Sequence, residues 1–173
     1  ASDLTIYGEG ELIVSANNND GITSKDGLII KSGTINVTAV DDGVRGKDYL
    51  VVKDGDITVN AQGDGFKSDN DEDVYKGFIS MEDGTVDITA SGDGMVAETN
   101  IEITTGNITI KTGGGSAAYL DAESSGKGIK ANVDITIDDG VLNIDSADDS
   151  IHTALGIIIN DGIFTLASGD DAI

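Results

Sequence analysis

The chain has 173 residues, with 10 Lys and Arg against 32 Asp and Glu, which gives a formal net charge of −22. This charge excludes nucleic acid as a partner, because its phosphates would be repelled. The absence of cysteine excludes a disulfide framework and thiol chemistry. No apolar run reaches the roughly 18 residues of a membrane span, so we expect no membrane insertion. The length suits one domain, residues 1–173.

Glycine recurs at a fixed spacing along the whole chain. One series opens a predicted strand in each unit: Gly10, Gly33, Gly55, Gly84, Gly106, Gly140 and Gly162. A second series closes most of these strands: Gly21, Gly43, Gly65, Gly94 and Gly128, continued by Ser150 and Ala172. Both series have a spacing of about 22 residues with the same two longer steps, which indicates a repeat architecture.

In chain order, each unit supplies apolar residues that alternate with polar ones, as in strands with one buried face. The first inward set lies within 35–39, 57–61, 86–90, 108–110, 142–144 and 164–166. The second lies within 28–30, 50–52, 79–81, 101–103, 135–137 and 157–159. A third inward position follows the closing residue: Ile22, Val44, Phe66, Met95, Ile129 and Ile151. The aromatic rings of Phe66, Phe78 and Phe164 are also assigned to the core.

Strands this short cannot bury a face alone, but stacked units enclose one continuous apolar column. The sequence therefore predicts an all-β, single-stranded parallel β-helix of about seven coils, with neighbouring coils about 4.8 Å apart. Two insertions should protrude from it as loops, at Ser68–Gly77 and roughly at Gly113–Gly126, where binding residues are common on repeat scaffolds. The chain ends in the middle of a unit, so a longer solenoid or an unusual cover for the last coil is expected.

A column of acidic residues precedes the closing glycines. Its members and their neighbours include Asp20, Asp41, Asp42, Asp64, Asp93, Asp148, Asp149, Asp170 and Asp171, with Lys127 interrupting it. Asp before Gly often serves only as a turn residue. Stacked carboxylates near 4.8 Å, however, repel by about 1 kcal/mol per pair even in water. We therefore name these residues as candidate Ca²⁺ ligands, and Lys127 as a built-in counter-charge between Asp93 and Asp149.

The first insertion offers a second candidate metal site. Asp69, Asp71 and Asp73 alternate there as at the start of a calcium loop, but the fixed Gly and distal Glu of an EF-hand are missing. A solvated acidic loop is the alternative. The only histidine, His152, has no clustered His or Cys partner, which argues against a zinc site.

A second column lies two residues after the closing position and is rich in basic side chains: Thr23, Arg45, Lys67, Val96, Lys130 and His152. These side chains should point outward. Either they pair with the neighbouring acidic column, or Arg45, Lys67 and Lys130 hold the carboxylates of an acidic polysaccharide beside bound Ca²⁺. Tyr75 and Tyr119, one in each insertion, are the candidate residues for stacking on sugar rings.

The repeated turns GDGFKSDNDED, SGDGMVAET and SADDSIHT, with the GxIxIxA strands, resemble the carbohydrate-binding-domain proteins of clostridia and their relatives. The resemblance spans essentially the whole chain, through short motifs of low complexity. It implies a right-handed β-helix similar to pectate lyases, in a protein that is secreted or on the bacterial cell surface. It also implies binding of Ca²⁺ and of plant cell-wall polysaccharide, notably cellulose and polygalacturonate. Departures at Lys127-Gly128 and Asp149-Ser150 disfavour a calcium site at the Lys127 coil.

Three functions follow as hypotheses. The first is a monomeric, non-catalytic, calcium-dependent polysaccharide-binding protein. The second is an enzyme of the pectate-lyase type, in which Arg45, Lys67 or Lys130 removes the proton that Ca²⁺ acidifies. The third is a structural surface or adhesin rod without a ligand.

Overall fold

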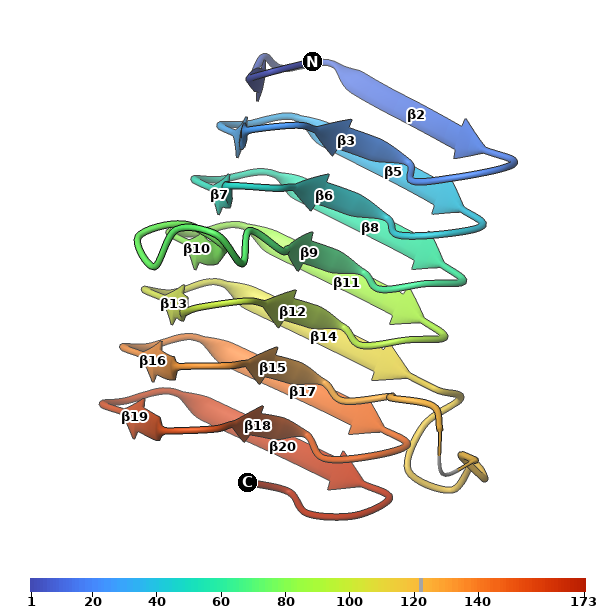
Figure 1. The fold of residues 1–173 in the computed structure, drawn as a ribbon, viewed down its shortest axis with the longest axis vertical. Helices are drawn as coiled ribbons and strands as arrows, with labels where there is room; N and C mark the ends of the chain where they lie inside the picture. Colours follow the sequence, from blue (N-terminus) through green and yellow to red (C-terminus); the bar gives the residue numbers. More distant parts are fainter. Residues whose placement is uncertain (122) are drawn as a thin grey trace.

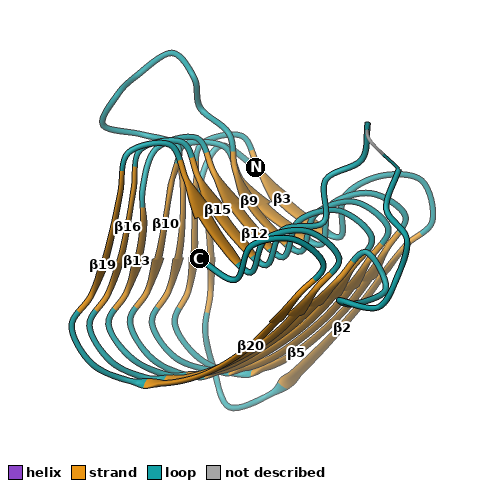
Figure 2. Ribbon diagram, turned by 90° about the horizontal axis from the view of Figure 1, so that it is seen from below, coloured by secondary structure: helices purple, strands orange, loops and turns teal. Residues whose placement is uncertain are grey.

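The computed structural model describes residues 1–121 and 123–173. The chain winds as a right-handed parallel β-helix, and its coils stack from the N-terminus to the C-terminus (Figure 1). Seen along the axis, each coil has three sides and a hollow that the core side chains fill (Figure 2). The all-β solenoid predicted from the repeats is therefore confirmed, with seven strands in each of its two larger sheets.

All three sheets are parallel, and each strand pairs with the equivalent strands of the coils before and after it. Sheet A contains β1 (Leu4–Ile6), β4 (Gly27–Ile30), β7 (Tyr49–Val52), β10 (Phe78–Met81), β13 (Ile101–Ile103), β16 (Asp134–Ile137) and β19 (Gly156–Ile159). Sheet B contains β2 (Glu11–Ala16), β5 (Thr34–Ala39), β8 (Asp56–Ala61), β11 (Thr85–Ala90), β14 (Asn107–Thr112), β17 (Val141–Ser146) and β20 (Ile163–Ser168). Sheet C contains β3 (Ile22–Ser24), β6 (Val44–Gly46), β9 (Phe66–Ser68), β12 (Met95–Ala97), β15 (Ile129–Ala131) and β18 (Ile151–Thr153).

The strand register places equivalent residues of neighbouring coils next to one another, as the columns in the sequence predict. In sheet B, Ile35 lies opposite Ile57, which lies opposite Val86 in the next coil. The inward residues of β5 and β8 are buried, while the intervening residues are exposed or partly exposed. One apolar column therefore runs along the helix axis, and its burial is the main favourable term in folding.

Glycine is required where each coil turns into sheet B. Gly55 has φ +135°, in the left-handed region that other residues resist, and a Cβ there would lie 3.0 Å from the carbonyl oxygen of Gly33 in the coil before. The same conformation recurs at the opening glycines from Gly33 to Gly162. Their regular spacing thus reflects a turn that each coil repeats in contact with its neighbour.

The two insertions leave opposite margins of sheet C. The first connects β9 to β10, at the end of the sheet C strands that faces sheet A. The second connects β14 to β15, at the end that faces sheet B. Both project from the coil outline (Figure 2), as predicted. Ala122, in the second insertion, lies outside the described residues.

One core assignment from the sequence is wrong. Phe66 is fully buried and Phe164 packs partly buried against the core, but Phe78 opens β10 with its side chain on the outer side of sheet A. There it stacks on Tyr49 of the coil before, with ring centroids 5.6 Å apart. Among the described residues, no helix is long or apolar enough to cross a membrane.

The stacked core predicts unequal costs for two leucine truncations. Leu50→Ala should lower the free energy of unfolding by about 2–5 kcal/mol, because Leu50 is fully buried and its removal leaves a cavity. Leu155→Ala, at a side chain that is 75% exposed, should change it by less than about 0.5 kcal/mol. Urea unfolding measures both, and equal effects would contradict the core described above.

Candidate functional site

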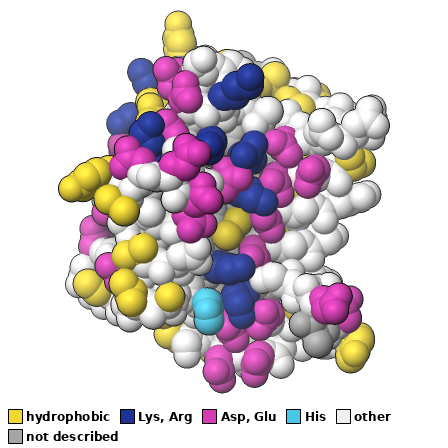
Figure 3. Space-filling model, viewed as in Figure 1, with side chains coloured by type: hydrophobic (Ala, Val, Ile, Leu, Met, Phe, Trp, Pro, Cys, Tyr) yellow, Lys and Arg dark blue, Asp and Glu magenta, His cyan; other side chains and the backbone are white. Residues whose placement is uncertain are grey.

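The acidic and basic columns lie side by side where sheet B turns into sheet C. Basic and acidic side chains alternate down this face of the molecule (Figure 3). The middle residues of the sheet C strands are in register, so Arg45 lies next to Lys67, and Lys130 next to His152. The outward orientation and the order predicted for the basic column are both found in the structure.

The aspartates form a hydrogen-bonded ladder from coil to coil. The Oδ1 of Asp42 accepts the backbone N–H of Asp64 at 2.9 Å, and the Oδ1 of Asp64 accepts that of Asp93 at 2.9 Å. The same bond joins Lys127 N–H to Asp93 at 2.8 Å and Asp171 N–H to Asp149 at 3.1 Å. Each of these carboxylates therefore satisfies a backbone donor at a turn, where no sheet hydrogen bond is available. We name this column the aspartate ladder.

The basic side chains supply most of the counter-charge that the ladder needs. Lys67 Nζ lies 3.0 Å from Asp42 and 2.8 Å from Asp64, and Lys130 Nζ lies 3.1 Å from Asp93. Burial lowers the pKa of the Lys67 ammonium, but Asp64 and Asp42 outweigh it and raise that pKa above its usual value. Of the two interpretations of the basic column, pairing with the acidic neighbours is thus the one the contacts support, and the middle coils are compensated by side chains.

Arg45 makes a different contact from the one the sequence suggested. Its guanidinium donates to both carboxylate oxygens of Asp69, from Nε to Oδ2 at 3.0 Å and from Nη2 to Oδ2 at 2.8 Å and to Oδ1 at 3.0 Å. Its distance from Asp20 is longer, 3.8 Å. Hydrogen bonding to Asp69 raises the pKa of Arg45. The first insertion is therefore fastened to the basic column through Asp69.

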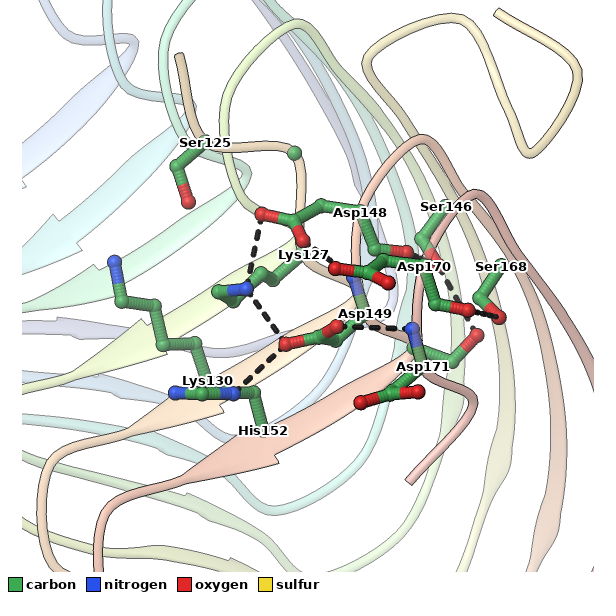
Figure 4. A network of polar contacts seen from close by, with 12 residues as sticks. Ser125, Lys127, Lys130, Ser146, Asp148, Asp149, His152, Ser168, Asp170 and Asp171 are labelled. Carbon is green, nitrogen blue, oxygen red and sulfur yellow. Dashed lines mark hydrogen bonds and ion pairs between the residues drawn. The ribbon is translucent and has the colours of Figure 1, made fainter. Parts of the chain in front are cut away.

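Lys127 is a counter-charge, as predicted, but only toward one side. Its Nζ lies 2.9 Å from Asp148 and 2.7 Å from Asp149, and His152 Nδ1 approaches Asp149 at 2.8 Å (Figure 4). Burial raises the pKa of Asp149, but the bonds from Lys127 outweigh it and the pKa is lowered. Asp93 instead is paired with Lys130.

Two acidic groups have carboxylate oxygens close enough together to share one cation. Within residues 1–121 and 123–173, these are Asp20, Asp41 and Asp42 near the N-terminal end, and Asp148, Asp149 and Asp170 near the C-terminal end. Their oxygens lie within 4.8 Å of one another. Carboxylate oxygens are hard ligands, so the donor set of both groups fits Ca²⁺.

Basic side chains partly neutralise both groups. The C-terminal group holds the ammonium of Lys127 against two of its three carboxylates. In the N-terminal group, Lys67 Nζ lies 3.0 Å from Asp42 and is shared with Asp64, and Arg45 lies 3.8 Å from Asp20. Burial, followed by repulsion from Asp42, raises the pKa of Asp20, and Arg45 only partly offsets this. The N-terminal group also lines an open cavity of about 380 Å³ together with Arg45 and Lys67, and we take it as the candidate cation site because this cavity leaves room for a cation and its further ligands.

The other predicted ligands do not come together in the same way. Asp64 and Asp93 belong to the ladder and its lysine pairs, and Asp171 donates its backbone N–H to Asp149. In the first insertion, Asp69 binds Arg45 and Asp73 accepts the N–H of Tyr75 at 3.0 Å. With Asp71 they form no shared group in the part of the chain that the structure describes.

The two candidate tyrosines are both exposed, Tyr75 by 86% and Tyr119 by 92%. They sit on different insertions at opposite margins of sheet C, so the structure does not bring them together. Tyr75 and Phe78 both line a cavity of about 270 Å³. Phe78 was not identified from the sequence as a surface residue, because an apolar ring at the start of a strand is usually buried. Only the alternation with Ile79 and Met81, which face the core, indicates that its side chain points outward.

A buried polar network under the first insertion was also missed. Asp48 accepts the side-chain amide of Asn70 at 2.6 Å, and its second oxygen binds Lys76 Nζ at 2.8 Å. The bond from Lys76 is the main cause of the lowered pKa of Asp48, whose burial acts in the opposite direction. These residues belong to two different coils, so nothing in the period of the sequence pairs them.

A protein-family model, described as carbohydrate-binding domain-containing protein, matches residues 1–172. The chain belongs to this family. Comparison with curated proteins gave no match, and neither did comparison with solved structures. The resemblance read from the turns and strands is thereby confirmed over nearly the whole chain, and the family points to a carbohydrate as the binding partner.

The ladder predicts that Lys67 stabilises the fold. Lys67→Met should lower the free energy of unfolding by about 1–3 kcal/mol, because Asp42 and Asp64 lose their shared partner. Lys111→Met, which breaks an exposed pair with Asp145 on sheet B, should cost less than about 1 kcal/mol. Denaturant unfolding at pH 7 measures both changes.

The raised pKa of Lys67 gives this prediction a second readout. Its contribution is complete below the ordinary lysine pKa of 10.5 and is lost as the pH rises through the higher value of the folded state. The gap in stability between the wild type and Lys67→Met should therefore shrink above about pH 10.5. A gap that is constant to pH 12 would contradict the pairing.

Proposed function

We propose that the protein is an extracellular, non-catalytic, calcium-dependent polysaccharide-binding protein whose ligands are cellulose and/or acidic plant cell-wall polysaccharide such as polygalacturonate. The observation that carries the proposal is the cavity in which Asp20, Asp41 and Asp42 face Arg45 and Lys67. Family membership supports a carbohydrate as the ligand. The location, secreted or on the cell surface, and the monomeric state are parts of the same proposal.

The cavity combines both charges that an acidic sugar needs. Asp20, Asp41 and Asp42 would hold Ca²⁺ at one side. Bound there, Ca²⁺ would offset the remaining negative charge of the three aspartates and would be coordinated by the carboxylate oxygens of a uronic acid. Arg45 and Lys67 line the same cavity, where they would share their N–H donors between their aspartate partners and a second carboxylate of the polymer.

The charge states of the basic residues favour binding over catalysis. A lyase needs a base that is unprotonated near neutral pH, and therefore a basic group with a lowered pKa. The pKa values of Arg45 and Lys67 are instead raised, through Asp69 for Arg45 and through Asp64 and Asp42 for Lys67. Lys130 is paired with Asp93. We therefore propose no lyase activity.

Calcium should stabilise the fold through the N-terminal acidic group. At a concentration of one hundred times Kd, bound Ca²⁺ should add about 2.7 kcal/mol to the free energy of unfolding. Asp41→Asn should remove most of this gain, whereas Asp87→Asn, an exposed aspartate on β11 in sheet B, should leave it intact. Melting curves with and without Ca²⁺ measure the effect. A gain that survives Asp41→Asn would place the cation elsewhere.

The calcium effect should also depend on pH in a defined direction. Because the pKa of Asp20 is raised above 3.8, ionisation of Asp20 destabilises the folded state as the pH rises through that raised value. Ca²⁺ binds the ionised form. The stabilisation by Ca²⁺ should therefore be absent below about pH 3.8 and should grow as the pH rises above it.

The binding function itself is tested with soluble polygalacturonate. We expect calorimetry to detect binding in Ca²⁺ and a large loss of binding in EDTA, and we expect no unsaturated product by absorbance. Arg45→Gln should weaken binding without removing the calcium effect on melting. If the wild type binds neither polygalacturonate nor a neutral polysaccharide at any calcium concentration, the proposed function is wrong.

A further inference from the structure

A cleft away from the acidic groups lies between the first insertion and sheet A. It has a volume of about 270 Å³ and is lined by Val74, Tyr75, Phe78, Thr99, Asn100 and Glu102. The insertion supplies the first two residues, β10 supplies Phe78, and Glu102 lies on β13 in the next coil. The lining is half apolar and half polar, which is the composition of ligand sites that use a few convergent polar groups for orientation.

The apolar part of the cleft is the end of a short aromatic stack. Tyr49 lies over Gly27 of the coil before, where a side chain would collide with the tyrosine ring. Phe78 stacks on Tyr49 at 5.6 Å with an interplanar angle of 21°. In the next coil the stack stops, because Asn100 occupies the equivalent position. Tyr49 covers one face of Phe78. Phe78 lines the cleft and Tyr49 does not, so Phe78 is the member of the stack that contributes apolar surface to the cleft.

The insertion holds Tyr75 in place at the mouth of the cleft. Asn70 Oδ1 accepts the N–H groups of Glu72 at 3.0 Å and Asp73 at 3.1 Å, and Asp73 in turn accepts the N–H of Tyr75 at 3.0 Å. The base of the insertion is fixed by the buried bond from Asn70 to Asp48 and by the ion pair of the partly exposed Lys76 with the same carboxylate. Tyr75 is thus exposed but carried on an ordered backbone, and a ligand that meets it need not order the loop.

The polar part of the cleft suits hydroxyl groups. Asn100 accepts the N–H of Asp134 through Oδ1 at 3.2 Å, which leaves its NH₂ group to donate to a ligand. The hydroxyl of Thr99 donates to the carbonyl of Lys76 at 2.7 Å and retains its acceptor lone pairs. The carboxylate of Glu102 accepts only, and it would form charge-assisted bonds with O–H donors.

The charges around the cleft select against an acidic ligand. Glu102 lies in the cleft, and Asp71, Asp73 and Glu98 line the adjoining cavity of about 240 Å³. A uronic acid would bring its carboxylate among these groups, whereas a neutral sugar presents apolar C–H faces and hydroxyl edges at no electrostatic cost.

We propose that this cleft is a subsite for one neutral pyranose unit of a polysaccharide, packed between Phe78 and Tyr75. The proposal rests on the polysaccharide-binding function proposed above, and it assigns the neutral sugars among the ligands to a place separate from the Asp20 cavity. The subsite needs no cation, since its contacts are an aromatic face and side-chain hydrogen bonds. It would let the protein hold a neutral segment while the Asp20 cavity holds an acidic one.

Calorimetry in EDTA with neutral gluco-, xylo- and manno-oligosaccharides tests the subsite. We expect at least one of them to bind without Ca²⁺. Tyr75→Ala should weaken that binding by about tenfold, the loss expected for one aromatic contact, and Tyr75→Phe should bind within about twofold of the wild type. The matched control is Tyr7→Ala, which removes an equally exposed tyrosine on the N-terminal coil.

Two further measurements locate the sugar. Binding should shift the NMR signals of the Asn100 side-chain amide. Glu102→Gln should raise the affinity for galacturonate oligomers in EDTA, because it removes a repelling carboxylate, and should weaken binding of the neutral oligosaccharide, because it loses the charge-assisted bonds. Tyr75 is exposed, so its substitution should leave the melting temperature unchanged and the binding data directly comparable.

The outcomes separate the two proposals. If polygalacturonate binds in Ca²⁺ but no neutral oligosaccharide binds in EDTA, or if Tyr75→Ala binds as the wild type does, the subsite is wrong and the proposed function stands. If the wild type binds no saccharide under any condition, the proposed function fails and the subsite fails with it.

Discussion

The structure depends on an aspartate that serves two coils at once. One carboxylate oxygen accepts a backbone N–H from the next coil, and the other faces a lysine, as in Asp64 between Asp93 and Lys67. The first bond satisfies a donor at a turn, and the second offsets the repulsion between stacked carboxylates. A solenoid with a net charge of −22 can keep this column of aspartates because Arg45, Lys67, Lys127 and Lys130 lie against it.

Lys67 and Lys127 contact the aspartate ladder at two levels of the β-helix. The negative charge of the aspartates is therefore not neutralised evenly along the axis. Near Asp149 the counter-charge is Lys127 at 2.7 Å, and His152 lies 2.8 Å from the same carboxylate. Near Asp20 the counter-charge is Arg45 at 3.8 Å, whose closer contact is with Asp69 on the first insertion. The first insertion thus affects the charge balance around Asp20 through Arg45, although the insertion leaves sheet C at the end that faces sheet A.

Much of this arrangement could be predicted from the sequence because the repeat converts position in the chain into position in space. Once the period is known, Arg45 must lie beside Lys67, and Asp42 beside Asp64. The repeat gives no prediction for the contacts of the insertions, because they have no equivalent in other coils. The pairing of Arg45 with Asp69 and the anchoring of Asn70 on Asp48 follow from the folded path of one loop. Each couples residues that no column relates.

The placement of the insertions has a consequence for the direction in which a long polymer could lie. They rise at opposite margins of sheet C (Figure 2) and at different levels along the axis (Figure 1). A chain that crosses sheet C at right angles to the axis would meet an insertion only at the level of the coil that carries it. A chain that crosses at another level, or obliquely between the two insertions, would meet neither. The insertions would therefore restrict the path of a long polymer in the coils that carry them and leave it open elsewhere.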